Sequence, residues 1–191
     1  MYQYPYYQYP YYQYPYFNNS IYNTYNMYSR NSQPIDVLMS MPCAIAYIRG
    51  GPLAPQLKGV VIFKSVPGGT EVFVEVSGLP QYKPGENDAP PVGPHGFHIH
   101  EFGICQTGNQ SDPFQEAGGH WNPTNQPHGN HAGDFPVLFS NDGYARMCFF
   151  TNKFTVQDVI GKAVIIHENP DDYRSQPSGA AGKRLGCGVI R

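Results

Sequence analysis

The sequence predicts an all-β domain, an antiparallel sandwich or barrel of eight short strands that is interrupted by two long loops. Glycine and proline contribute 21 and 19 of the 191 residues, and so many turn-forming residues argue against a helical bundle. The apolar segments are short, and some alternate apolar and polar residues with the period of two that is typical of a strand. An antiparallel all-β fold is therefore favoured over any α/β arrangement.

Eight segments account for the predicted strands. Residues 70–77 alternate most regularly, with Val72, Val74 and Val76 on one face. A Pro-Gly-Gly tripeptide before them predicts a hairpin, and Asn-Asp-Gly at 141–143 predicts a second tight turn. Residues 103–134 and 168–184 form the two long loops, which in a compact domain are usually functional. In order, the predicted strands are 43–49, 57–65, 70–77, 95–102, 135–139, 144–151, 161–167 and 185–190.

The first 40 residues differ in composition from the remainder. After Met1 come three tandem copies of Tyr-Gln-Tyr-Pro-Tyr, and 12 of the 16 tyrosines precede residue 29. Recurrent proline disfavours helices and central strands. We predict a disordered tail over residues 1–40 and a folded domain over 41–191. The tail is either a passive extension or a tether that self-associates or is cross-linked through dityrosine.

The composition also limits the partners and the location. A net charge of −2 gives no electrostatic basis for binding nucleic acid or an anionic membrane. No apolar run approaches the roughly 18 residues that span a bilayer. The chain start lacks the basic and aliphatic segments of a signal peptide. We expect synthesis in the cytoplasm, with assembly into a surface or coat layer through the tail as a further hypothesis.

All seven histidines fall between residues 95 and 167. His98 and His100 are two apart in a predicted strand, so both imidazoles point to the same side and can reach one ion. Downstream, one loop contains three imidazoles and a carboxylate, a complete tetrahedral set that suits zinc. These four residues are His120, His128, His131 and Asp134.

His167 ends an aliphatic predicted strand, where a buried polar group is costly without a partner. Taken alone, it is a hydrogen-bonded core residue or a strand end that faces solvent. Combined with His98 and His100 it supplies a third imidazole, and nitrogen-rich sites of this kind suit copper as well as zinc.

Five segments of the folded domain resemble signature motifs of the Cu,Zn superoxide dismutase family, in the family's order. They are Gly-Phe-His-Ile-His-Glu-Phe-Gly at 96–103, Gly-Gly-His-Trp-Asn-Pro at 118–123, His-Ala-Gly-Asp at 131–134, His-Glu-Asn-Pro-Asp-Asp at 167–172 and Gly-Lys-Arg-Leu-Gly-Cys-Gly-Val-Ile at 182–190. The resemblance covers residues 43–191. It implies an eight-stranded antiparallel Greek-key barrel or sandwich, similar to immunoglobulin domains.

The resemblance also implies the metals and their ligands. His120 would bridge copper and zinc through its two ring nitrogens. The implied copper ligands are His98, His100, His120 and His167, and the implied zinc ligands are His120, His128, His131 and Asp134. The implied activity is conversion of superoxide to oxygen and hydrogen peroxide by copper redox cycling, with zinc in a structural role.

Further roles follow from the same resemblance. Asp171 would link the free ring nitrogens of His98 and His128 from behind the metals. Arg184 would be the cation that guides the anionic substrate to copper. Because the bridging His120 would also handle a proton, both it and Arg184 are expected to be catalytic. His95 matches a structural histidine of the family and is not a predicted ligand.

The four cysteines divide into two pairs. Cys105 and Cys187 occupy the positions of the family's intrasubunit disulfide. Cys43 and Cys148 lie in predicted strands, where we expect free core thiols.

One departure from the family pattern concerns zinc. Only two residues separate His128 from His131, whereas the commonest animal and plant members have a longer segment. Asn and Gly tolerate tight turns, so this loop can still close.

Two other functions compete with the enzyme. The first is a non-catalytic module that binds zinc or buffers copper. The second is a coat or assembly protein that is anchored by the tyrosine-rich tail, a role compatible with catalysis. A homodimer is also expected from the family.

Overall fold

The computed structural model describes residues 42–86 and 89–191. The predicted disordered tail lies outside the described residues. The described part is all-β, as predicted: seven strands form one antiparallel sheet in the order β4-β6-β7-β1-β2-β3-β5. The strands are β1 (Cys43–Gly50), β2 (Lys58–Val66), β3 (Gly69–Ser77), β4 (Phe97–His100), β5 (Tyr144–Thr151), β6 (Ala163–His167) and β7 (Arg184–Val189).

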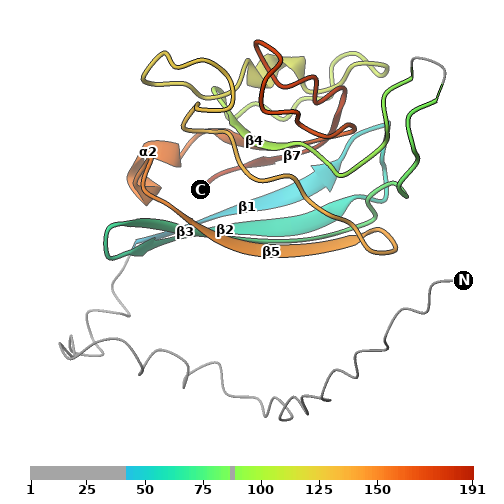
Figure 1. Cartoon of the computed structure of the whole chain (residues 1–191). Coiled ribbons are helices and arrows are strands. Elements are labelled where there is room, and N and C mark those ends of the chain that lie inside the picture. Colours follow the sequence, from blue (N-terminus) through green and yellow to red (C-terminus); the bar gives the residue numbers. More distant parts are fainter. Residues whose placement is uncertain (1–41, 87–88) are drawn as a thin grey trace, which may run out of the picture. The chain divides into compact units, whose positions relative to one another are not determined.

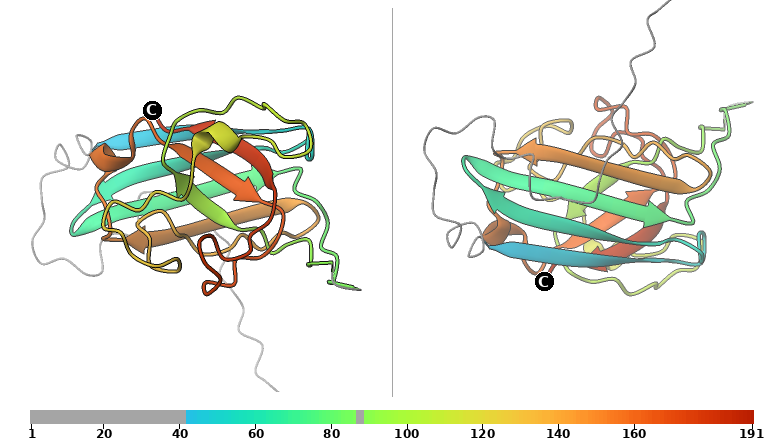
Figure 2. Two further views of the ribbon diagram at one scale, coloured as in Figure 1. Left: turned by 90° about the horizontal axis from the view of Figure 1, so that it is seen from above. Right: turned by 90° about the horizontal axis from the view of Figure 1, so that it is seen from below.

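The sheet curls on itself into two facing layers (Figure 1). Strands β1, β2, β3 and β5 form one layer, and β4, β6 and β7 cross it on the other side, as the views from above and below show (Figure 2). The alternation in β3 buries Val72, Val74 and Val76, as predicted, against Phe63 of β2 and Phe97 of β4 in the common core. Burial of this apolar surface is the main stabilising contribution to the fold.

One of the eight predicted strands, residues 135–139, is wrong, because this segment is not a strand in the structure. This segment makes only one isolated bridge, between His95 and Leu138. Pro136 has no N–H to donate, and the Val137 N–H donates instead to the Tyr173 hydroxyl oxygen at 2.8 Å. A ladder therefore cannot extend along the segment.

Strands β4 and β6 of the second layer, the first an edge strand and the second its neighbour, differ from the rest of the sheet in being buried on both faces. Every residue of β4 and β6 is buried. The two long loops explain this burial, because they lie over β4 and β7 on the side away from the first layer (Figure 1). The two long loops thus pack against the outer face of the layer that contains β4 and β6 (Figure 1).

Helical structure is minor. Within the described ranges it consists of a 3-10 turn, η1 (Gln115–Ala117), and one α-helical turn, α2 (Val156–Val159). A capping box between Thr155 and Asp158 begins α2. Among the described residues, no helix is long and apolar enough to cross a membrane.

The cysteines confirm one prediction and correct another. Cys105 and Cys187 form the predicted disulfide, with Cα atoms 5.6 Å apart. Cys43 and Cys148 are free, but both are exposed, so the expectation of core thiols is wrong. In β5 the pleat turns Ala145 toward the core and Cys148 outward.

Candidate metal centre

Strands β4 and β6 position the first histidines. His98 and His100 project from the same face of β4, whose register pairs them with Ile165 and Ala163 of β6. His167 ends β6 at an irregularity in the ladder between Ile166 and His167, and its N–H donates to the Gly96 carbonyl at 2.8 Å. The loop residue His120 joins them through a backbone bridge to His100.

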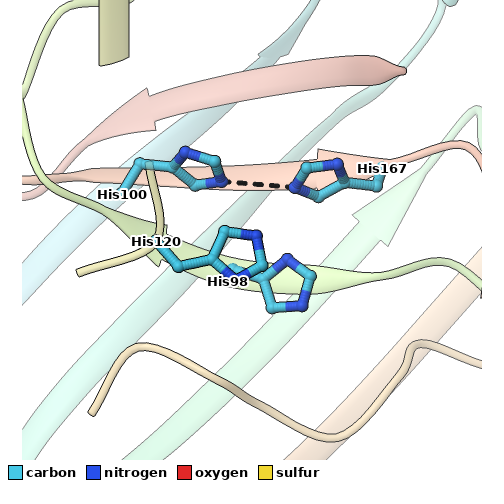
Figure 3. A group of neighbouring side chains, drawn as sticks. All are labelled: His98, His100, His120 and His167. Atoms are coloured by element: carbon cyan, nitrogen blue, oxygen red, sulfur yellow. Dashed lines mark hydrogen bonds between the residues drawn. The ribbon is translucent and has the colours of Figure 1, made fainter. Parts of the chain in front are cut away.

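These four imidazoles converge (Figure 3). The Nε2 atoms of His100 and His167 are 3.2 Å apart, and the rings of His98 and His120 stack with centroids 3.9 Å apart. One ligand nitrogen from each residue lies within 4.8 Å of the others. We call His98, His100, His120 and His167 the four-histidine set.

Hydrogen bonds determine which nitrogen of each ring is available. His98 Nε2 donates to Asp171 Oδ2 at 2.6 Å, His100 Nδ1 donates to the Gly118 carbonyl at 3.0 Å, and His167 Nδ1 donates to the Gly182 carbonyl at 3.2 Å. The second nitrogen of each neutral ring therefore presents a lone pair to the centre of the set. Lone pairs on His100 and His167 that face each other at 3.2 Å repel, and a cation between them removes the repulsion.

Burial keeps these rings neutral. It lowers the pKa of His98 and His100 well below the ordinary value and lowers the pKa of His167 to about 3. The neighbouring imidazoles act in the same direction. Neutral imidazole is the form that binds a metal, so His98, His100 and His167 are prepared for a cation at neutral pH.

A second set meets at Asp134. Its Oδ1 atom lies 3.0 Å from His120 Nδ1 and 3.3 Å from the Nδ1 atoms of His128 and His131. Its Oδ2 atom accepts the backbone N–H groups of Gly129 and His131, both at 2.9 Å. We call His120, His128, His131 and Asp134 the His/Asp set.

The electrostatics of Asp134 favour the carboxylate form. Burial alone would raise the pKa of this carboxyl group. The hydrogen bond from His120 and the nearby imidazoles of His128 and His131 outweigh that effect, so the pKa lies well below its usual range. The carboxylate is therefore ionised and available as a ligand.

His120 belongs to both sets. Its Nδ1 atom faces Asp134, while its Nε2 atom is buried without a hydrogen-bond partner among the described residues. The Nδ1 atoms of His98, His128 and His131 are buried in the same condition. A buried polar atom without a partner is costly, and a metal ion in each set would satisfy all of them. Three imidazoles with a carboxylate fit zinc, and four imidazoles fit copper.

Asp171 connects the two sets from behind. Its Oδ2 atom binds His98 Nε2 at 2.6 Å, and its Oδ1 atom binds His128 Nε2 at 2.9 Å. Gly179 makes room for this arrangement, because a Cβ atom there would overlap Asp171 Oδ1 and crowd His128 Nε2. This glycine also has a φ of 66°, a backbone conformation that residues with a side chain rarely adopt.

Arg184 stands beside the four-histidine set. Its Nη1 donates to the Phe114 carbonyl at 2.6 Å, and its Nη2 donates to the Gly118 carbonyl at 2.7 Å. Gly118 is also the acceptor for His100, so one carbonyl fixes both the cation and a histidine of the set. Burial lowers the pKa of Arg184, yet a guanidinium stays charged at physiological pH.

The structure brings every predicted site residue together, and it adds two that the sequence did not single out. Gln176 hydrogen bonds to the backbone of His128, and Tyr173 hydrogen bonds to the segment after Asp134. No signal marked Gln176. Tyr173 could have been noticed as one of the few tyrosines outside the tail, close after Asp171. His95, expected to be structural, binds the His167 carbonyl through Nδ1 at 2.9 Å.

Comparisons with known proteins agree with this geometry. The family model described as copper/zinc superoxide dismutase (SODC) matches residues 57–190. A curated Cu-Zn superoxide dismutase of Deinococcus radiodurans is 36% identical over 153 residues, covering 71% of this chain and 78% of that protein. One from Legionella pneumophila is 34% identical over 145 residues, covering 72% and 80%.

A solved structure extends the agreement to the fold. The crystal structure of a double mutant of an SOD-like protein from Bacillus subtilis superposes with a TM-score of 0.59 at 31% identity, covering 76% of this chain and 95% of the other. The chain belongs to the copper/zinc superoxide dismutase family.

Proposed function

We propose that this protein converts superoxide to oxygen and hydrogen peroxide at a copper ion held by the four-histidine set, beside a zinc ion held by the His/Asp set. The observation that carries the proposal is the position of His120, whose two ring nitrogens face two different ligand sets. A module that only stored one metal would not need a shared imidazole.

Bound copper would supply one-electron transfer between its two oxidation states, which is the chemistry that dismutation of superoxide requires. The chain contributes the environment for this chemistry. The Nε2 atom of His120 can hold a proton and release it toward the substrate, while Asp134 keeps the Nδ1 side of the ring in place. The second proton of hydrogen peroxide comes from solvent.

Arg184 provides the attraction for the substrate. Two backbone carbonyls fix its guanidinium beside the four-histidine set, so its charge does not need to reorganise when an anion arrives. A small anion such as superoxide is steered toward this charge. The same two bonds leave the remaining guanidinium N–H groups for the substrate.

The test is metal analysis of the protein after loading with both metals, combined with a superoxide consumption assay on the same sample. We expect about one copper and one zinc per chain with rapid turnover, as the two sets require. Zinc binding without turnover after copper loading would contradict the proposal and favour the non-catalytic metal-binding module.

We also propose self-association, as a homodimer and through the tail. Two features support it: exposed apolar side chains on the described surface, such as Tyr47 and Phe139, and the three tandem tyrosine repeats. Two tyrosines and one hydrogen peroxide would give one dityrosine and two waters in the presence of a peroxidase. Light scattering should report a dimer, and dityrosine fluorescence should appear when superoxide and a peroxidase are supplied. A monomer in light scattering would contradict the homodimer, and an absence of dityrosine fluorescence would contradict cross-linking through the tail.

A further inference from the structure

Within the turn that carries His128 and His131, hydrogen bonds to Asp134 hold only part of the backbone. Gly129 and Asn130 alone separate the two histidines, and Gly129 has a φ of 90°. Asp134 Oδ2 fixes the later half of the turn by accepting the N–H groups of Gly129 and His131. The backbone of His128, at the start of the turn, takes no part in these bonds.

Gln176 supplies the missing support from 48 positions away in the sequence. The His128 N–H donates to Gln176 Oε1 at 2.8 Å, and Gln176 Nε2 donates back to the His128 carbonyl at 3.3 Å. One side chain thus engages both backbone polar groups of His128. A further bond from Nε2 to the Arg174 carbonyl at 3.1 Å orients the amide.

Tyr173 supports the other end of the same loop. Its N–H donates to Asp171 Oδ1 at 2.6 Å. Its hydroxyl oxygen accepts the Val137 N–H at 2.8 Å and donates to the Phe135 carbonyl at 3.3 Å. Its carbonyl oxygen lies against Gly129, where a Cβ atom would crowd it. Tyr173 therefore joins Asp171 to the segment that follows Asp134.

These contacts leave one ring nitrogen of His128, Nδ1, without a hydrogen-bond partner among the described residues. Asp171 holds the ring at Nε2 and Gln176 holds the backbone, so only the Nδ1 atom remains for the His/Asp set. We propose that Gln176, with Tyr173, is a positioning residue that fixes His128 Nδ1 and the segment after Asp134 for zinc. This inference rests on the proposed function, since it requires the His/Asp set to bind zinc.

The expected effect follows from the general behaviour of residues that orient metal ligands. Losing such a partner typically lowers metal affinity by about 10- to 100-fold. The Gln176 side chain bonds to the backbones of His128 and Arg174, and among the described residues it makes no hydrogen bond to the four-histidine set. Zinc affinity should therefore fall by about 10-fold, and copper affinity much less.

The experiment measures zinc affinity of the full chain by competition with a chromophoric chelator. Gln176→Ala should weaken zinc binding about 10-fold. The matched control is Gln157→Ala, on the exposed face of α2, which should bind zinc like the unmutated chain. Gln176→Glu keeps an oxygen that accepts the His128 N–H but loses the two bonds that Nε2 donates, so its zinc affinity should lie between those of Gln176→Ala and the unmutated chain. Tyr173→Phe, which removes only the hydroxyl, should show a smaller loss than Gln176→Ala.

A spectroscopic measurement separates positioning from simple loop stability. Cobalt(II) bound at the His/Asp set should give the absorption of a tetrahedral site in the unmutated chain and in Gln176→Glu, and a weakened, shifted spectrum in Gln176→Ala. Unchanged zinc affinity and an unchanged cobalt spectrum in Gln176→Ala would overturn the inference. The inference would also be overturned if Gln176→Ala lowered the melting temperature by the same amount in the metal-free and in the zinc-loaded protein, each compared with the unmutated chain. If Gln176→Ala does not fold, Tyr173→Phe decides the question. A normal cobalt spectrum and an unchanged zinc affinity in Tyr173→Phe would then overturn the proposed positioning role.

The failure of the proposed function is distinguishable from these outcomes. If the unmutated chain binds neither zinc nor cobalt, the His/Asp set itself is wrong and both proposals fall. If the unmutated chain binds zinc and the variants bind it equally well, only the positioning role is wrong.

Discussion

The four-histidine set and the His/Asp set share one imidazole but are built in different ways. Three members of the first set lie on adjacent strands β4 and β6, where every residue is buried and the ladder fixes the backbone. All four members of the second set lie on one irregular loop, where side-chain hydrogen bonds hold the backbone groups beside the ligands. A sheet can position ligands by its period alone, whereas a loop needs a bonded partner for each ligand.

The largest effect on activity is expected from removing a ligand of the four-histidine set, which strands β4 and β6 position. His167→Ala removes one of four imidazoles while β6 keeps its ladder to β4 and β7. Superoxide consumption by the copper-loaded variant should fall by at least about 1000-fold, roughly 4 kcal/mol in activation free energy, with far-UV circular dichroism unchanged. A variant that turns over at the original rate would show that copper does not use this histidine.

The disulfide connects strand β7 to the loop that carries Gly118. It closes a loop with a sequence separation of 82 residues, so the double substitution of Cys105 and Cys187 by Ser should lower the free energy of unfolding by about 4 kcal/mol. Chemical denaturation measures this change. Cys148→Ser, at an exposed free thiol, is the control and should change the unfolding free energy by less than about 0.5 kcal/mol.

Gly179→Ala tests the link between the two sets. A Cβ atom at this position would displace Asp171 and His128 together, so metal binding at both sets should weaken. We expect a loss of about 3 kcal/mol in the stability of the metal-loaded protein, from the steric clash and the unfavourable φ. Gly161→Ala is the matched control, since Gly161 also has a positive φ, 84°, but nothing within 4 Å of the added atom. Equal losses in the two variants would mean that Asp171 tolerates displacement.

Removing zinc should affect the loop more than the strands. Without zinc, the His/Asp set contains buried nitrogens that lack hydrogen-bond partners among the described residues. The backbone N–H groups of His128, Gly129 and His131 are held by side-chain acceptors rather than by a strand ladder. Amide exchange of residues 128–134 should speed up by about tenfold or more, while β4 and β6 stay protected. Hydrogen-exchange mass spectrometry on zinc-loaded and zinc-free protein measures this, and equal acceleration in both regions would remove the distinction between them.

The smallest effect is expected at Arg184, which touches neither set as a ligand. Arg184→Ala should reduce the superoxide rate by about tenfold, because the loss of the local charge reduces electrostatic steering. The remaining rate should also depend less on ionic strength, because salt screens the attraction in the unmutated protein. Stopped-flow measurements at low and high salt give both numbers. A rate unaffected by the substitution would assign Arg184 to loop structure only.

The contrast between strand and loop also explains what the sequence alone could predict. The period of two in β4 places His98 and His100 on one face without knowledge of any other element. The pairing of Gln176 with His128 depends on the path of two loops, which no local pattern encodes. The alternation rule failed at residues 135–139, because Pro136 and a tertiary bond from Val137 prevent a ladder. The expectation that Cys148 lies in the core rested only on its place in a predicted strand, whereas the alternation in β5 puts it on the same outward face as Arg146.

The central claim is that one imidazole, His120, lies between two different metals. A crystal structure of the protein loaded with copper and zinc, with anomalous scattering recorded at both absorption edges, tests it most directly. We expect a copper peak on the Nε2 side of His120, within the four-histidine set, and a zinc peak on the Nδ1 side, within the His/Asp set. A single peak, or a His120 ring that ligates only one of two ions, would contradict it.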